Sequence, residues 1–393
     1  MSKRLWTVRL AAPALALIYA AAQTDRFRQM SIDAETKGLA DPYKGISTNG
    51  TIRPGLYPVR ATGVSTEPVR KAAAAFLAAL TPEQRGKTVF PVDDVEWRKW
   101  MNQDFYVRQG VGFLDMNDAQ KEAAFGLMRA SLSAKGLQLS RDIMRLNYTL
   151  GELNNNDFVR YGEWRYWITM MGEPSKDKPW GWQLDGHHLI INYFVMGDQV
   201  VMTPTFLGSE PVIAPSGKFK GVTILQDEQS MGLKMIQSLD EGQRKKAILE
   251  FSKTGNNNLT EAFKDNVVLD FAGAPVSSFN AAQKKQLMDL AGLYVGTMRE
   301  GHAKVKMEEI RGHLNETYFA WIGGIEEKSV YYYRIHSPVI LIEFDHQRPV
   351  GMRHLMANPQ LPFREHIHSV MRTPNGNDYG KDLLRQHYAR SKH

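Results

Sequence analysis

Two histidines separated by a single residue, His366 and His368, have the clearest potential for chemistry in this 393-residue chain. They lie in a short β-prone run, and side chains alternate across a strand, so both imidazoles are expected on one face about 7 Å apart. A carboxylate, Glu343, interrupts the apolar run 339–344, which is typical of a neighbouring strand. Two imidazoles and one carboxylate are a sufficient ligand set for a divalent metal ion. The sequence therefore predicts a metal site at His366, His368 and Glu343.

The position of Glu343 between Ile342 and Phe344 has two explanations. Burying an unpaired carboxylate costs several kcal/mol, so the group needs a cation or strong hydrogen bonds. A metal ion would supply the charge, and so would Arg334 on the preceding strand. Asp345 shares the expected face of Glu343 and could orient an imidazole.

Two adjacent histidines, His187 and His188, follow Asp185-Gly186, which predicts a bulge or bend inside a long strand over 181–195. Neighbouring residues on a regular strand point in opposite directions. We expect His188 to reach the metal or the substrate, with His187 as a further metal ligand if the bulge turns both rings. A cross-strand aromatic contact is the alternative for either ring.

Further residues could serve as acid, base or second site. Asp378 and His336 are candidates for the acid or base beside a metal-bound water. His302 and His313 lie on one side of a predicted helix and could form a second site, although a solvated face is the favoured interpretation. The chain has no Gly-rich phosphate loop, Gly-x-Ser-x-Gly elbow or His-Glu-x-x-His helix, which disfavours the common nucleotide-binding and serine-hydrolase classes.

Helices are marked by a recurring capping box, in which a short polar residue precedes a glutamine by three positions. The pattern predicts helix starts near residues 82, 118, 241 and 281. The spacings between the four boxes are irregular, so we interpret them as a shared capping solution, not as a sequence repeat.

Strand-like segments lie between and after these helices, at 161–171, 181–195, 199–206, 316–322, 330–335, 339–344 and 366–370. Helices and antiparallel-looking strands occur in runs without βαβ alternation, which predicts an α+β fold. We expect an antiparallel sheet core with helices packed on it, a mostly helical N-terminal half and one domain over 66–393. Residues 23–65 lack periodicity and are expected to form an extended lead-in.

The N-terminus has the pattern of a secretory signal peptide over residues 1–22. Three basic residues precede a short Ala- and Leu-rich stretch that ends in small residues. No run is long enough for a comfortable membrane span, although an uncleaved N-terminal anchor is the alternative. The net charge of +7, three of it in this segment, gives no basic block that would favour nucleic-acid binding. With no cysteine, a metal site must use His, Asp and Glu.

The segments GWQLDGHHL and PNGNDYGKDLLRQHY resemble the exported proteins classed as domain of unknown function 3500. The resemblance extends over most of the chain after the signal. It implies a single domain and a periplasmic or secreted location, and it brings no established activity or ligand.

The combined interpretation is an exported metal-dependent hydrolase, with zinc as the preferred ion and a metal-bound water as the nucleophile. Two histidines and one carboxylate also suit a non-haem iron or copper oxidoreductase. A non-catalytic periplasmic protein that binds metal or a small ligand is the third alternative. The expected partner is a small-molecule or saccharide-like substrate, because exposed tryptophans would suit a flat sugar ring.

Overall fold

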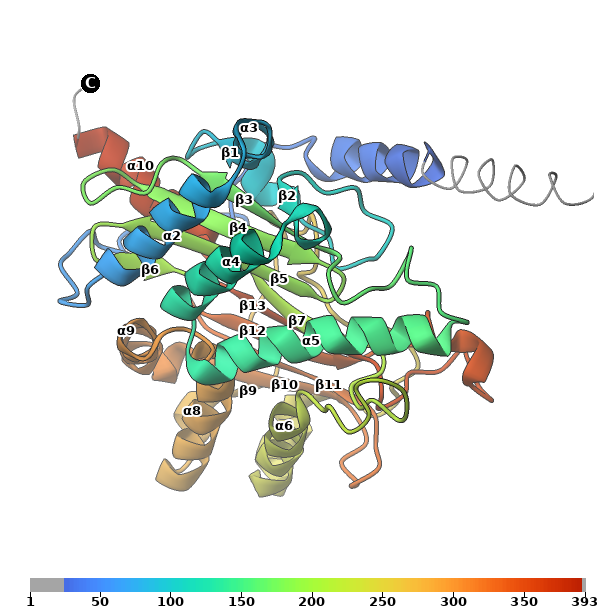
Figure 1. The fold of residues 1–393 in the computed structure, drawn as a ribbon. Coiled ribbons are helices and arrows are strands. Elements are labelled where there is room, and N and C mark those ends of the chain that lie inside the picture. Colours follow the sequence, from blue (N-terminus) through green and yellow to red (C-terminus); the bar gives the residue numbers. More distant parts are fainter. Residues whose placement is uncertain (1–24, 391–393) are drawn as a thin grey trace, which may run out of the picture.

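The computed structural model describes residues 25–390, which form an α+β fold around one large mixed sheet (Figure 1). In this described part the sheet has 13 strands in the order β1-β3-β4-β5-β7-β13-β12-β11-β10-β8, with β2, β6 and β9 paired alongside. The helices are α2 (Glu67–Ala79), α3 (Pro82–Thr88), α4 (Asp118–Ser131), α5 (Ala134–Leu153), α6 (Gln226–Ser238), α7 (Glu241–Ala247), α8 (Ala281–Val295), α9 (Glu300–Gly312) and α10 (Lys381–Arg390). The strands are β1 (Val89–Phe90), β2 (Val111–Gly112), β3 (Tyr166–Met171), β4 (Trp180–Gly186), β5 (Leu189–Met196), β6 (Gln199–Val201), β7 (Thr205–Ser209), β8 (Ile248–Glu250), β9 (Ala274–Pro275), β10 (Tyr318–Gly323), β11 (Tyr331–His336), β12 (Leu341–His346) and β13 (Ile367–Arg372).

The four predicted capping boxes are confirmed. Each helix start has a cap side chain that accepts from the backbone N–H of a glutamine, and that glutamine accepts in return from the cap residue. The cap residues are Thr81 of α3, Asn117 of α4, Asp240 of α7 and Asn280 of α8. Local sequence therefore determines where these helices begin.

The capping glutamines also join the helices in pairs. The side-chain Nε2 of Gln120 in α4 donates to Oε1 of Gln84 in α3 at 2.7 Å. In the same way, Nε2 of Gln283 in α8 donates to Oε1 of Gln243 in α7 at 2.8 Å. The same two-helix corner is thus built twice.

The duplication extends to the whole sheet. Residues 67–209 and 226–372 each run through two helices, two short strands, two longer helices and a series of long strands. α2 and α6 both have 13 residues, and α3 and α7 both have 7. The strand order is the same when read outward from β7 and β13, which pair antiparallel at the centre. The fold is a pseudo-twofold duplication, so the interpretation of the capping boxes as unrelated to a repeat is wrong.

The two faces of the sheet are covered differently. Helices pack on one face, and Figure 1 shows α2, α4 and α5 lying across it. Loops and α10 cover the other face around Trp97, Trp100 and Tyr379. Ile342, Phe344 and Ile367 belong to the helix-covered core, so their neighbours Glu343, Asp345, His366 and His368 project toward the loop-covered face.

The structure differs from the predicted fold in three places. Residues 25–38 form a helix, so the prediction of a fully extended lead-in over 23–65 is wrong, while the predicted signal peptide lies outside the described residues. The predicted long strand over 181–195 is two strands, β4 and β5, joined by a tight turn at His187-His188. The sheet is mixed because β1 and β8 run parallel to β3 and β10. Within residues 25–390 no helix is long and apolar enough to cross a bilayer.

Candidate metal centre

The turn between β4 and β5 places His188 at the edge of the sheet. Gly186 ends β4 where an added Cβ would lie 2.1 Å from the Tyr166 ring, so only glycine fits. His188 itself has a left-handed φ of 64°, which turns its side chain away from the path of a regular strand. The backbone N–H of His188 donates to Asn102 O at 3.2 Å, and its carbonyl accepts from Gly208 N at 2.9 Å. The turn is therefore fixed on both sides.

Strand β13 brings His366 and His368 to the same point. His368 is paired across the sheet with Gly208 of β7, which has no side chain to occupy the space next to His188. The Nε2 atoms of the three histidines lie 3.2 Å (His188–His366), 3.1 Å (His188–His368) and 3.0 Å (His366–His368) apart. All three residues are buried, and they are the group of potential metal ligands found in the described part of the chain. The structure brings His366 and His368 to one point, as their spacing predicts, and places His188 beside them.

The Nδ1 partners of two of these histidines determine which nitrogen carries the proton. His366 Nδ1 lies 2.7 Å from the carbonyl oxygen of Arg348, which can only accept. His368 Nδ1 lies 2.7 Å from Oε1 of Glu261. In the neutral rings both Nδ1 atoms must therefore donate, which leaves lone pairs on both Nε2 atoms. These lone pairs point at one another, an arrangement that a cation between them would relieve.

The spacing of the three nitrogens suits a first-row metal ion. Two ligands that each lie 2.0–2.1 Å from one zinc ion are about 2.8–3.4 Å apart for angles between octahedral and tetrahedral. The observed separations of 3.0–3.2 Å lie inside this range. Three histidines leave further coordination positions open toward solvent or a substrate.

Burial favours the neutral form of His366 and His188. It lowers the pKa of His366 to about 4, against the opposing charge of Glu210, and it lowers the pKa of His188 well below the usual value, with His187 adding to the effect. A neutral imidazole is the form that binds a metal.

His187 lies beside this cluster without joining it. Its ring stacks on that of His188 with centroids 4.0 Å apart, and its Nδ1 lies 2.8 Å from Oδ1 of Asn147. The structure thus gives it a packing contact in place of the predicted ligand role.

Glu343 is also not part of the cluster. Its two carboxylate oxygens accept from Leu259 N and Thr260 N, both at 2.9 Å, from Tyr332 OH at 2.7 Å and from the Thr260 hydroxyl. Burial raises the pKa of Glu343 against these hydrogen bonds. The strong hydrogen bonds that a buried carboxylate needs come from Leu259 and Thr260, in an irregular segment more than eighty residues earlier, and from Tyr332. These bonds take the place of the metal ion or the Arg334 pairing considered from the sequence.

The segment that Glu343 holds also carries Glu261, a residue that the sequence analysis did not place at the site. Asp345 lies two residues after Glu343, on the same face of β12. It accepts from Asn257 N at 2.6 Å and pairs with Lys253 Nζ at 2.9 Å. Together the two carboxylates fix residues 253–261 against the sheet, and this delivers Glu261 to His368. Such a carboxylate sets the orientation of a metal-binding imidazole. Asp345 therefore orients the imidazole indirectly, through the segment that it anchors.

Glu210 was also missed and has a similar indirect role. Its oxygens accept from the backbone N–H groups of Val350, Gly351 and Met352 at 2.8–3.2 Å. This fixes the turn after Arg348, whose carbonyl holds His366. Neither Glu210 nor Glu261 stands in a recognisable motif, so the sequence has no local signal for them.

The two proposed acid–base residues lie elsewhere. His336 ends β11 and packs against Phe271, with ring centroids 4.7 Å apart. Asp378 accepts from Thr373 N at 2.7 Å and pairs with Arg372 at 3.2 Å in a fully buried network. The structure does not bring either residue to the three histidines.

A cavity of about 240 Å³ opens in front of the histidines. Carboxamides supply much of its polar lining, and the charged pair Arg160–Asp104 is hydrogen-bonded internally. Its lining includes Asn102, Gln103, Phe105, Asn256, Gln347 and Val350. The cavity therefore offers neutral carboxamides beside the metal ligands, while its charged residues are engaged with protein partners: Arg160 with Asp104, Glu210 with backbone N–H groups and Glu261 with His368.

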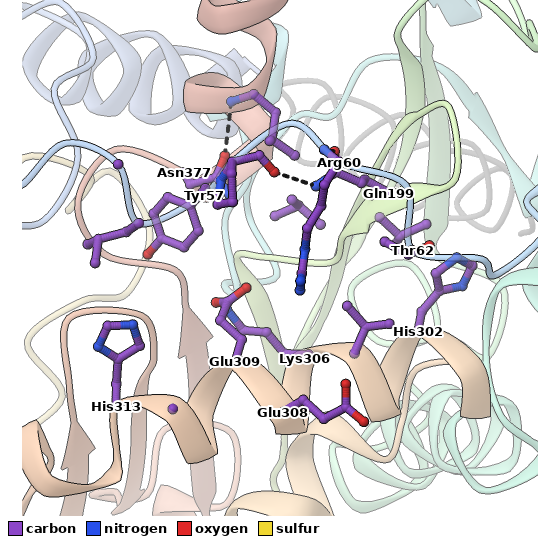
Figure 2. Close-up of a pocket in the computed structure, with 18 residues that line it drawn as sticks. Tyr57, Arg60, Thr62, Gln199, His302, Lys306, Glu308, Glu309, His313 and Asn377 are labelled. Atoms are coloured by element: carbon purple, nitrogen blue, oxygen red, sulfur yellow. Dashed lines mark hydrogen bonds and ion pairs between the residues drawn. The ribbon is translucent and has the colours of Figure 1, made fainter.

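A larger hollow of about 450 Å³ lies between the segment 55–62 and α9, and it contains none of the three clustered histidines (Figure 2). His302, Glu308, Glu309 and His313 border it, but Figure 2 shows them spread along the helix and not converging on a point. Glu309 is paired with Lys306 at 2.6 Å. Glu308, Glu309 and His313 lie on the solvated side of the helix, as expected, whereas His302 is buried.

Comparison with known proteins gives a family without an activity. The profile of the family described as "Protein of unknown function (DUF3500)" matches residues 62–381. No curated protein and no solved structure matches the chain. The resemblance based on GWQLDGHHL and the C-terminal motif is confirmed, and the site must be interpreted from its own geometry.

Proposed function

Since the chain belongs to this family of proteins of unknown function (DUF3500), we propose its activity from the site itself: an exported metal-dependent hydrolase whose ion is held by His188, His366 and His368. The observation that supports this most is the convergence of three histidine Nε2 atoms in the lining of a cavity. Three nitrogen ligands with open positions are the arrangement of catalytic zinc sites.

The residues around the site have separate tasks in this proposal. Glu261 and the Arg348 carbonyl hold two rings in the tautomer that presents Nε2, and Gly208 leaves room for the third. Zinc at this position would lower the pKa of a bound water so that it serves as a nucleophile near neutral pH. Glu261 accepts a hydrogen bond from His368 Nδ1, and its negative charge would raise the basicity of that ring as a ligand.

The oxidoreductase alternative is weakened because Glu343 does not join His366 and His368 in a ligand set of two histidines and one carboxylate. The substrate we favour is small and polar, since the cavity is lined by carboxamides. Sugar stacking on tryptophan has little support, because Trp180, Trp182 and Trp321 are fully buried. Export is proposed from the basic and apolar pattern of residues 1–22.

The proposal is tested by metal analysis of protein purified without a histidine tag. We expect about one zinc ion per wild-type chain and less than a tenth of that in His368→Ala, with the far-UV circular dichroism unchanged. The exposed His354→Ala is the matched control and should retain its metal. Stoichiometric zinc in the His368 variant would contradict the assignment, and iron or copper in the wild type would favour the oxidoreductase.

A further inference from the structure

Three exposed apolar side chains lie in the chain segments that border the histidine cavity. Val350 lines the cavity and is 63% exposed, and Val159, next to the lining residue Arg160, is 73% exposed. Leu355, on the same loop as Val350, is 49% exposed. Isolated exposed apolar residues are common, but exposed apolar residues in segments that border a cavity are candidates for ligand contact. We call these three residues the apolar rim.

The apolar rim is held in place from below. Leu150, Tyr161 and Met352 form a small buried cluster under it, with Leu153, Met356 and Phe363 packed around them. Glu210 fixes the backbone of residues 350–352 by its hydrogen bonds. The rim is therefore a preformed surface that can bind a ligand without first being ordered.

The inner cavity has the opposite character. Its carboxamides, Asn102, Gln103, Asn256 and Gln347, offer neutral donors and acceptors. The charge of Arg160 is compensated by Asp104, and that of Glu261 is directed to His368. A ligand that matches both regions has a neutral polar group near the histidines and an apolar part at the mouth.

We infer that the substrate is an acylated small molecule, with the carbonyl of an ester or amide at the three histidines and an aliphatic chain on the apolar rim. This inference rests on the proposed function, because it places the reacting bond at the metal. Hydrolysis would break the bond between the acyl carbon and its oxygen or nitrogen, add water across it, and release a carboxylic acid with an alcohol or amine.

Two metal-binding probes of different chain length test the inference. Acetohydroxamate and octanohydroxamate carry the same metal-binding group, and isothermal titration of the zinc-loaded full-length protein measures their affinities. We expect octanohydroxamate to bind at least tenfold more tightly, because its added methylenes leave water on the rim. The double variant Val159→Ser/Val350→Ser should reduce this ratio to about one. Val268→Ser, at a valine 59% exposed and not lining the cavity, is the control and should preserve the ratio.

The outcomes separate the two proposals. Zinc-dependent binding with equal affinities for both probes would overturn the acyl inference and leave the metal site intact. A protein that takes up no zinc would overturn the proposed function and this inference with it. A chain-length preference that survives in the double variant would also contradict the role of the rim.

Discussion

At the scale of single residues, the site depends on carboxylates that never touch the proposed ion. Glu343 looked like a ligand because a carboxylate inside an apolar strand needs a partner. The partner is the backbone of Leu259 and Thr260, which no local pattern links to β12. His366 and His368 could be predicted because strand alternation alone places them together. Glu261 could not, because only the tertiary fold brings its irregular segment to His368.

The different roles of Glu343 and His368 predict different mutant phenotypes. Glu343→Gln places an amide NH₂ where the carboxylate now accepts from backbone N–H groups, so we expect a loss of about 1–3 kcal/mol in the free energy of unfolding. The zinc content per chain should stay at the wild-type value, as measured by metal analysis of the same protein preparation before denaturant is added. Loss of zinc from the folded variant would return Glu343 to the ligand set.

A second carboxylate predicts a pH dependence of stability. Burial raises the pKa of Glu96 to about 8, against the opposing charge of Lys99, while an unfolded glutamate titrates near 4.5. A raised folded pKa contributes stability below about 4.5 that is lost as the pH rises through 8. Glu96→Gln should therefore be no more stable than wild type at pH 4.5 and about 1–4 kcal/mol more stable at pH 9 by urea unfolding. The exposed Glu122→Gln should show no such trend.

At the scale of elements, the helix starts were the most predictable feature because a capping box is complete within four residues. The sequence does not reveal that the capping boxes are joined in pairs, because the hydrogen bonds between their glutamines connect different helices. The spacings look irregular because two of them separate boxes within one half of the fold, from α3 to α4 and from α7 to α8, whereas the third separates the two halves. The β4–β5 turn was missed because Leu189 to Val195 continues the apolar run without a proline or a second glycine.

The interlocked glutamines predict an energetic coupling. Gln243→Ala and Gln283→Ala each remove a capping contact as well as the hydrogen bond between α7 and α8. We expect each to lower the free energy of unfolding by about 1–2 kcal/mol and the double-mutant cycle to give a coupling of about 0.5 kcal/mol or more. The pair Gln138→Ala and Gln283→Ala, with Gln138 exposed on α5, serves as the uncoupled reference. Additive effects in the first cycle would argue against the pairing.

At the scale of the whole molecule, the histidines come from both halves of the duplicated fold. His188 lies in the half that ends with β7, and His366 and His368 lie on β13 of the other half. The turn of the second half that corresponds to His187-His188 contains Pro338-Val339 and no histidine. The fold class could be predicted from the order of elements, but the position of the site at the central seam could not, because it depends on which strands pair.

This position predicts how a divided chain should behave. The connection between the halves is exposed at residues 215–218, so a cut there should leave β7 and β13 paired. Co-expressed fragments 1–215 and 216–393 should co-purify and bind zinc, and neither alone should bind it in a one-to-one ratio. Size-exclusion chromatography with metal analysis measures both properties. A single fragment that retains stoichiometric zinc would show that the ion does not need both halves.

The absence of cysteine gives the shared histidine cluster one more consequence. An ion held by His188, His366 and His368 would cross-link positions on the chain that are almost half its length apart. In an exported protein that role usually falls to a disulfide. A coordinated cross-link differs in that a chelator removes it reversibly, so the resistance of this protein to heat and proteases would follow the supply of metal in its surroundings.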